Sequence, residues 1–112
     1  MSIQKWSDQI WFVAPDDEPN FSEELSGLRD EATKVDPMPH LIVDLAGVNH
    51  LNSSQITQLL RVRKLVKDNE VSLRLAGPSD SVWAIFLTTG LDKIFRFSSD
   101  ISTALAELQM KL

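Results

Sequence analysis

The sequence predicts an α/β fold in which a mixed β-sheet is flanked by helices, and three observations support this prediction. Two short apolar runs surround a polar turn within residues 3–13, which is typical of a β-hairpin. Short β-branched runs then alternate with longer stretches whose apolar residues recur at helical spacing. Because strands separated by helices need crossover connections, we expect the later strands to be mostly parallel, with the hairpin adding an antiparallel pair.

The first expected elements are the hairpin and one helix. In "IQKWSDQIWFVAP" the turn falls at Ser7-Asp8-Gln9, and Pro15 ends the second strand. A helix should begin at Asn20, because Asn20 and Glu23 have the spacing of a capping box, and the prolines of "VDPMP" should end it. Its expected inward residues are Leu25, Leu28 and Ala32, and its expected outward residues are Glu24, Arg29 and Glu31.

The run "HLIVDLAGV" predicts a strand that is buried on both faces, because it is apolar, β-branched and too short for a helix. A second helix should follow from Asn52 to about Asp68. Its expected inward residues are Ile56, Leu59, Leu60, Arg63 and Val66, and its expected outward residues are Gln55, Gln58, Arg61 and Lys64.

The last third of the chain repeats the pattern of strand and helix. "VSLRLAG" predicts a strand, and a turn then leads into a helix from about Ser81 to Thr88 that Gly90 ends. "KIFRF" predicts a last short strand, and Asp100 should cap a final helix that runs through Leu108. The core-facing residues of the third helix should be Val82, Ile85 and Phe86.

Composition restricts the classes of function. The 112 residues suit a single domain, 1–112, and 43% apolar residues are enough for one core. The absence of cysteine excludes disulfides, thiolate catalysis and cysteine-ligated zinc. A net charge of −5 disfavours nucleic acids and anionic membranes as partners, and no apolar run approaches the length of a membrane span. With no signal-peptide pattern at the N-terminus, we expect a cytoplasmic protein.

Catalytic patterns are weak in this sequence. A pairing of His50 with Ser53 lacks an orienting carboxylate and any sign of a nucleophile elbow. Asp44 lies in a buried-looking strand, where a backbone or basic partner at the strand end is a better explanation than catalysis. His40 and His50 do not have metal-ligand spacing, and the scattered glycines form no phosphate-binding loop. We therefore expect a protein that is not an enzyme and that needs no cofactor or metal.

The stretch "LNSSQITQLL" at residues 51–60 has two interpretations. In the first, Asn52 caps the helix and Gln55 returns a bond to the cap, which explains every residue type present. In the second, Ser53 also accepts a phosphate. A helix N-terminus carries about half a positive charge, so it tolerates a phosphoserine, whose charge at neutral pH is about −1.5 to −2. The fold would survive this modification, and a partner docked there would be repelled.

Residues 41–108 resemble a STAS domain of the bacterial anti-sigma-factor-antagonist type. The resemblance rests on "LIVDLAGVNHLNSSQITQLLRVRKLV", on "SLRLAGPSDSVWAIFLTTGLDKIFRF" and on an Ala- and Leu-rich closing helix. It implies a sheet of four or five strands flanked by about four helices. It also implies partner switching, in which the unphosphorylated domain binds a serine kinase that sequesters a sigma factor or another regulator, and phosphorylation releases the domain.

The same resemblance assigns the site residues. The family motif Asp-Ser-Ser/Thr-Gly-Leu-Gly aligns its first serine with Ser53, with Ser54 and Thr57 as weaker alternative acceptors. Asn52 stands in place of the aspartate, and Gln55 and Thr57 replace the two glycines. The expected partner-binding residues on the outer face of the helix are Gln55, Thr57, Gln58 and Arg61.

Two other functions remain open at this stage. One is a STAS subunit or scaffold that is not phosphorylated, such as the accessory subunit of a lipid-transport ABC ATPase. The other is a sensor of a small ligand such as GTP or a fatty acid. The tryptophans add a further question: we expect Trp6 to be buried, whereas Trp83, one residue off the apolar stripe of its helix, could be buried or part of a contact patch.

Overall fold

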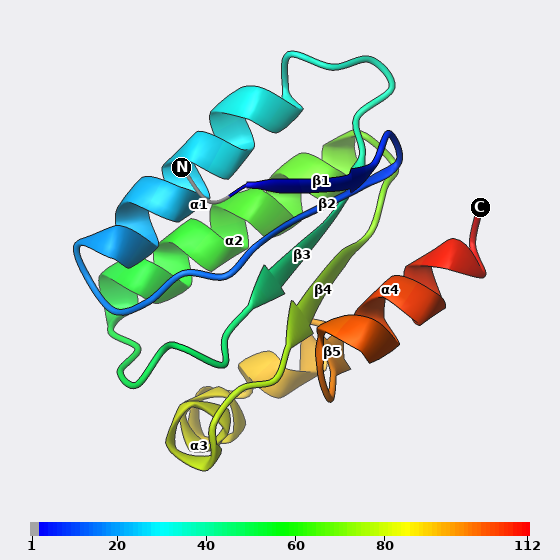
Figure 1. The fold of residues 1–112 in the computed structure, drawn as a ribbon. Coiled ribbons are helices and arrows are strands. Elements are labelled where there is room, and N and C mark those ends of the chain that lie inside the picture. Colours follow the sequence, from blue (N-terminus) through cyan, green and yellow to red (C-terminus); the bar gives the residue numbers. More distant parts are fainter. Residues whose placement is uncertain (1–2) are drawn as a thin grey trace.

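The computed structural model describes residues 3–112 and contains one five-stranded mixed sheet (Figure 1). The strands are β1 (Gln4–Ser7), β2 (Ile10–Val13), β3 (His40–Asp44), β4 (Leu73–Ala76) and β5 (Phe97–Ser98). Their spatial order equals their chain order; β1 is antiparallel to β2, and the remaining neighbours are parallel. The predicted hairpin and the predicted mixed sheet are both confirmed.

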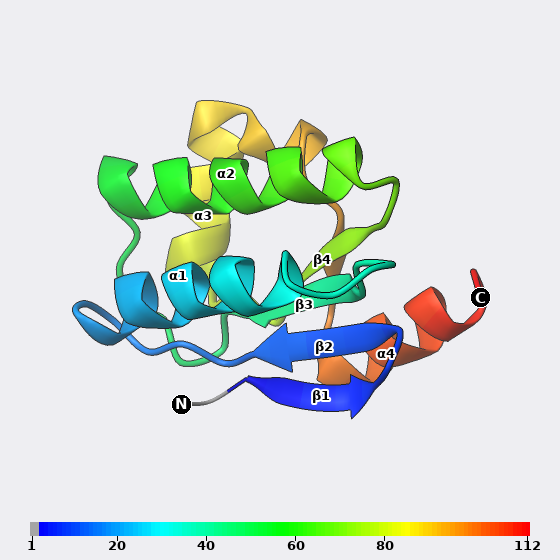
Figure 2. The ribbon, with the colours of Figure 1, turned by 90° about the horizontal axis from the view of Figure 1, so that it is seen from above.

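The helices lie on both sides of the sheet. They are α1 (Asn20–Ala32), α2 (Ser53–Asp68), α3 (Asp80–Thr89) and α4 (Ile101–Gln109), with a 3₁₀ turn η1 at Leu91–Lys93. Figures 1 and 2 show α1 and α2 side by side over one face of the sheet, with α4 on the other face. Within residues 3–112, no helix combines the length and the apolar character needed to cross a bilayer.

Strand β3 explains how the sheet supports two cores. Leu41 and Val43 join the main core beneath α1 and α2, whereas Ile42 joins a smaller core beneath α4, and all three are fully buried. Side chains alternate between the faces of a strand, so a strand covered on both sides must be apolar at every position. The prediction of a doubly buried strand is confirmed.

Several helix ends follow the predicted chemistry. Gly90 ends α3 with a φ of 76°, and the Asp100 side chain caps α4 by accepting a hydrogen bond from the Thr103 N–H at 2.7 Å. At the end of α2, the N–H of Glu70 donates to the Lys67 carbonyl and that of Val71 to the Val66 carbonyl, which is a Schellman motif. Glu70 adopts a φ of 57° there, in the left-handed region that favours glycine.

The predicted start of α1 is wrong in its details. Pro19 occupies the cap position, and no side chain caps the helix through the predicted Asn20–Glu23 box. Instead, the Glu18 carboxylate accepts from the Ser22 N–H at 2.7 Å, and the Asn20 side chain accepts from the Asp16 N–H. Glu24, predicted to face outward, is 7% exposed and receives a hydrogen bond from the Asn20 amide.

The last strand is shorter and later than predicted. Of the segment "KIFRF", Phe97 alone belongs to β5, because the N–H groups of Ile94 and Phe95 both donate to the Leu91 carbonyl in a tight turn. Backbone donors used in this way are not free to extend the ladder with β4. The strand is therefore reduced to two residues.

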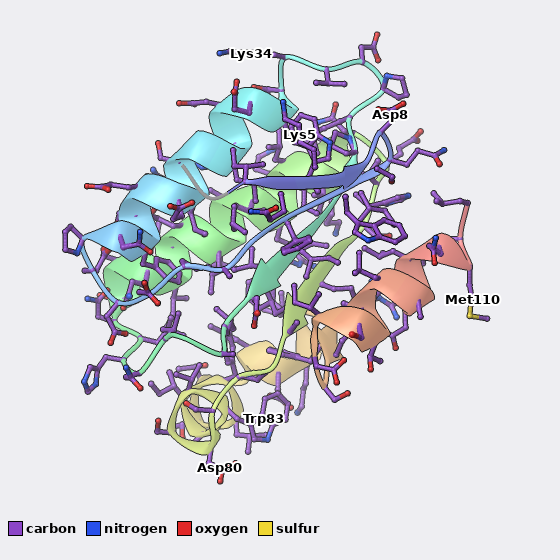
Figure 3. The ribbon with its side chains drawn as sticks, in the orientation of Figure 1. Lys5, Asp8, Lys34, Asp80, Trp83 and Met110 are labelled. Carbon is purple, nitrogen blue, oxygen red and sulfur yellow. The ribbon has the colours of Figure 1, made fainter. Side chains whose placement is uncertain are left out.

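The tryptophans differ in exposure. Trp6, predicted to be buried, is 46% exposed, because β1 is an edge strand and α4 packs on β3, β4 and β5. Trp11 is buried, with the Lys5 ammonium 4.7 Å from its ring centroid. Trp83, on α3, is half-buried and makes an edge-to-face contact with Phe97; Figure 3 shows its position.

Candidate partner-binding site at the start of helix α2

The candidate site lies at the edge of the sheet where the parallel strands end. Because β2, β3 and β4 run in the same direction, the loops that lead from them into α1, α2 and α3 leave from this one edge. Figure 1 shows the starts of α1 and α2 next to each other there. The β3–α2 loop carries the polar sequence that ends in Asn52 and Ser53.

A complete capping box fixes the first turn of α2. The Asn52 side chain accepts a hydrogen bond from the Gln55 N–H at 2.9 Å, and the Gln55 side chain accepts one from the Asn52 N–H at 2.7 Å. The predicted cap is confirmed. The Gln55 side chain bonds back to the helix start and is only 2% exposed, so its predicted outward position is wrong and it adds almost nothing to the accessible surface.

The hydroxyl groups of this turn are accessible. Ser53, Ser54 and Thr57 are all exposed, and Ser53 is the first residue of α2. The Thr57 hydroxyl donates to the Ser53 carbonyl at 2.9 Å, so it is held against the helix backbone. Ser53 therefore combines exposure with a place at the positive end of the helix dipole.

Asp17 holds the β3–α2 loop against the start of α1. Its carboxylate accepts hydrogen bonds from the Asn49 N–H at 2.8 Å, the Asn49 side-chain amide at 3.0 Å and the His50 N–H at 3.1 Å. These bonds, above all the one from the Asn49 side chain, lower the pKa of Asp17, and the charge of His50 acts in the same direction. The sequence analysis did not identify Asp17, because its partners lie 32 and 33 residues away.

The two residues considered for catalysis, His50 and Asp44, have other surroundings. His50 is exposed and forms no hydrogen bond with Ser53 in the described part of the chain. The Asp44 carboxylate accepts a hydrogen bond from the Ala46 N–H at 3.0 Å, which confirms the predicted backbone partner at the strand end. Among residues 3–112, no group of three or more His, Asp or Glu side chains could hold a metal ion.

A polar groove between α1 and α2 continues from the serine pair. It encloses about 480 Å³ and contains no acidic residue. Its lining residues are Ser22, Ser26, Arg29, Ser54, Thr57, Gln58 and Arg61. The Gln58 amide donates to the Ser22 hydroxyl at 2.6 Å and links the two helices, while Arg61 is exposed. Arg29 and Arg61 make the groove cationic, and the Arg29 Nε is buried without a hydrogen-bond partner among the described residues.

Comparisons with known proteins support the fold. The family model described as STAS domain matches residues 3–104. Comparison with curated proteins gives no match.

Similar solved structures include a serine-to-glutamate variant of Moorella thermoacetica RsbS, with a TM-score of 0.81 and 19% identity over 96% of this chain and 92% of that one. A candidate anti-sigma factor antagonist from Thermotoga maritima has a TM-score of 0.78 and 19% identity over 92% and 90%. An anti-sigma-factor antagonist (STAS) domain protein from Planctomyces limnophilus has a TM-score of 0.74 and 21% identity over 95% and 97%.

Proposed function

Because the chain belongs to the STAS domain family, we propose that it is a regulatory binding module that docks a serine kinase or anti-sigma factor through the start of α2. The surface for the partner consists of Ser53, Ser54, Thr57, Gln58 and Arg61, which lie at the first turns of α2 and along its groove with α1. Asn52 serves as the cap that fixes the position of the hydroxyl groups. On this proposal the module acts by binding.

The observation that carries the proposal is the exposed hydroxyl of Ser53 at the first position of a firmly capped helix. A phosphate at Ser53 adds about two negative charges next to free helix N–H groups, so the helix tolerates it. A docked partner must desolvate the same dianion, which opposes binding. Phosphorylation therefore changes the contact surface while the fold stays intact.

The test compares partner capture by wild-type protein and by Ser53→Glu. Each is immobilised and exposed to lysate of the native cell, and retained proteins are identified by mass spectrometry. We expect the wild type to retain a kinase or anti-sigma factor and Ser53→Glu to retain about tenfold less, as for a charge placed in a docked interface. Ser102→Glu is the matched control, because Ser102 is also an exposed first-turn residue, but it belongs to α4 on the opposite face of the sheet.

A second measurement tests the phosphoacceptor directly. The captured kinase is incubated with the protein and ATP, and the sites are mapped by mass spectrometry. Phosphate at Ser53, lost in Ser53→Ala, is expected. If Ser53, Ser54 and Thr57 all stay unmodified and Ser53→Glu still binds the partner, the switch is excluded and the chain is a constitutive STAS subunit.

A further inference from the structure

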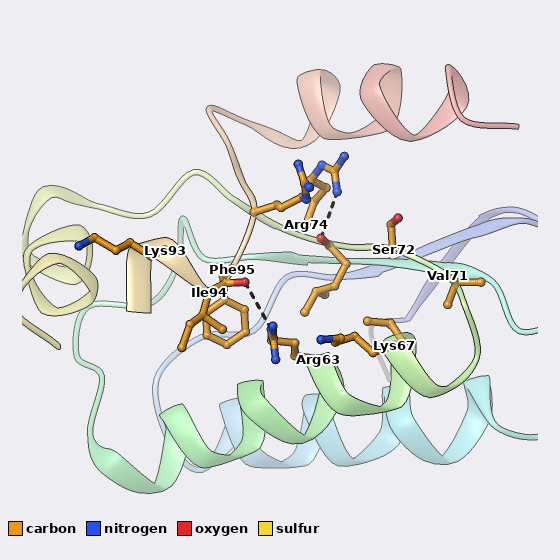
Figure 4. A pocket seen from close by; sticks show the side chains of 11 residues that line it. Arg63, Lys67, Val71, Ser72, Arg74, Lys93, Ile94 and Phe95 are labelled. Carbon is orange, nitrogen blue, oxygen red and sulfur yellow. Dashed lines mark hydrogen bonds between the residues drawn. The ribbon is translucent and has the colours of Figure 1, made fainter. Parts of the chain in front are cut away.

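A basic pocket lies at the other end of α2, away from Ser53. It has a volume of about 490 Å³ and lies between the second half of α2, the start of β4 and the segment that joins η1 to β5 (Figure 4). Five of the residues that line it are basic: Arg63, Lys67, Arg74, Lys93 and Arg96. The other lining residues are apolar, apart from Ser72, and none is acidic.

The short last strand creates this pocket. β5 pairs with β4 only at Leu75 and Ala76, so Leu73 and Arg74 have no strand neighbour on that side. The chain before β5 runs over the opening instead, and the Arg63 Nε donates to the Ile94 carbonyl at 3.3 Å to hold it in place. Figure 4 shows Arg63 and Lys67 extending from α2 toward β4, with the Arg74 guanidinium on the far side of β4, toward α4.

The charges of the pocket are largely uncompensated. The chain has a net charge of −5, yet five of its eleven Lys and Arg residues line this one cavity. Arg74 has a carboxylate partner, Glu107, 3.6 Å from its Nε. The other four cations form no ion pair within 4.0 Å with any carboxylate of residues 3–112.

Arg74 lies at the far edge of the pocket, because it alternates with Leu73 and Leu75 along β4 and faces Glu107 of α4. Its side chain is only 8% exposed, and its guanidinium donates to the Leu73 carbonyl at 3.3 Å. Cations gathered in a concave site reinforce one another's attraction for an anion.

From this arrangement we propose that the pocket binds a small organic phosphate. The Arg63 guanidinium suits phosphate oxygens, because a guanidinium can donate two parallel hydrogen bonds, and Lys67 adds a second positive charge from the same helix. Val71 and the exposed side chain of Ile94 offer an apolar wall for the organic part of the ligand. The volume lies within the range of about 300–1,000 Å³ that is typical of small-molecule sites. The inference goes beyond the partner-binding function and does not depend on it.

Two simpler roles account for part of the basic cluster. Lysine and arginine side chains protect open strand edges from pairing with other chains, and Lys67 lies in the last turn of α2, where it offsets the helix dipole. Neither role requires a cavity or predicts saturable binding of a ligand. Saturable binding therefore separates the proposal from both.

The test is isothermal titration of the full chain with sodium pyrophosphate and with ATP, at constant ionic strength and without magnesium. We expect saturable binding that is weakened about tenfold or more in the double variant Lys67→Gln/Arg96→Gln, because two charge-assisted contacts are lost. Lys64→Gln is the matched control: Lys64 is on the same helix and carries the same charge, but it lies outside the pocket and pairs with Asp68 at 2.8 Å.

Three results would overturn the proposal. The first is that neither pyrophosphate nor ATP binds saturably. The second is an equal loss of affinity in Lys64→Gln, which would mean that general charge attraction explains the signal. The third is binding to vesicles of anionic phospholipid together with no binding of the soluble phosphates, which would identify a membrane-contact surface in place of a small-molecule site. None of these results bears on partner capture through Ser53.

Discussion

His40 shows how one residue makes the fold sensitive to pH. It is half-buried at the start of β3, and its Nδ1 accepts a hydrogen bond from the Ser72 N–H at 2.9 Å. Burial lowers the pKa of His40 below its ordinary value of 6.5, and the nearby charges of Lys111 and Arg74 lower it further. The neutral imidazole, with its proton on Nε2, is therefore the form that the folded state favours.

The sign of the pH effect follows from this shift. The unfolded chain binds a proton at His40 more readily than the folded chain, so the contribution is complete above pH 6.5 and is lost as the pH falls toward the lower folded pKa. We expect the free energy of unfolding of the wild type to fall more steeply between these pH values than that of His40→Asn, whose amide can still accept from Ser72. Urea titrations at several pH values measure both slopes. Parallel slopes would contradict the assignment.

At the scale of the element, the C-terminus of α2 contains one residue whose backbone conformation lowers the stability of the fold. Glu70 occupies the left-handed position of the Schellman motif with a φ of 57°, where a residue with a Cβ is about 1–2 kcal/mol less stable than in the right-handed region. The pattern at Gly90 shows the usual solution, because glycine takes the corresponding position after α3.

Replacing Glu70 with glycine should therefore stabilise the protein. We expect Glu70→Gly to raise the free energy of unfolding by about 1 kcal/mol, measured by thermal or urea unfolding followed by circular dichroism. Glu70→Ala serves as the control, because it removes the same charge near the helix end and keeps the Cβ. If both variants are stabilised equally, the gain comes from the charge and the conformational explanation fails.

For the whole molecule, the cores on the two faces of the sheet are covered by different numbers of helices. The main core collects residues from α1, α2 and α3, whereas the smaller core relies on α4, chiefly through Ala104 and Leu108. A polar link supports this face: Glu107 accepts a hydrogen bond from the Ser98 hydroxyl and lies near Arg74, so it joins α4 to two strands.

Leu108→Ala should consequently lower the free energy of unfolding strongly. Leu108 is fully buried, and removal of a buried leucine side chain costs about 2–5 kcal/mol, a large part of the stability of a small domain. Met110→Ala, two residues further along and 88% exposed, should change stability by no more than about 0.5 kcal/mol. Urea unfolding of the two variants tests this, and a small effect of Leu108→Ala would show that α4 is dispensable for the fold.

Much of this architecture could be predicted from local signals. The order of the elements, the doubly buried β3 and the caps at Asn52 and Asp100 depend on residues close together in the chain. The errors have different causes, one within a single turn of helix and one between distant elements. Gln55 is buried because its capping bond directs it inward, and Trp6 is exposed because α4 packs on other strands.

The site was likewise predicted in part. The cap and the exposed hydroxyls at the start of α2 follow from spacing within one turn of helix. The anchoring of the loop by Asp17 and the basic pocket could not be predicted in this way, since each joins segments about 30 residues apart. The spacing of residues in the sequence does not predict such long-range contacts, because they depend on how the crossover connections place the elements in the fold.

The anchoring by Asp17 also makes the arrangement of the serines depend on the folded domain. A peptide copied from α2 would contain both serines and the cap. It would lack the Asp17 carboxylate, which holds the loop before the serines in place. Short isolated helices are only marginally stable in water, so such a fragment would present the serines in many conformations. A chain in which the sheet and α1 have not yet assembled would therefore not hold the serines in the arrangement through which the proposed partner would bind.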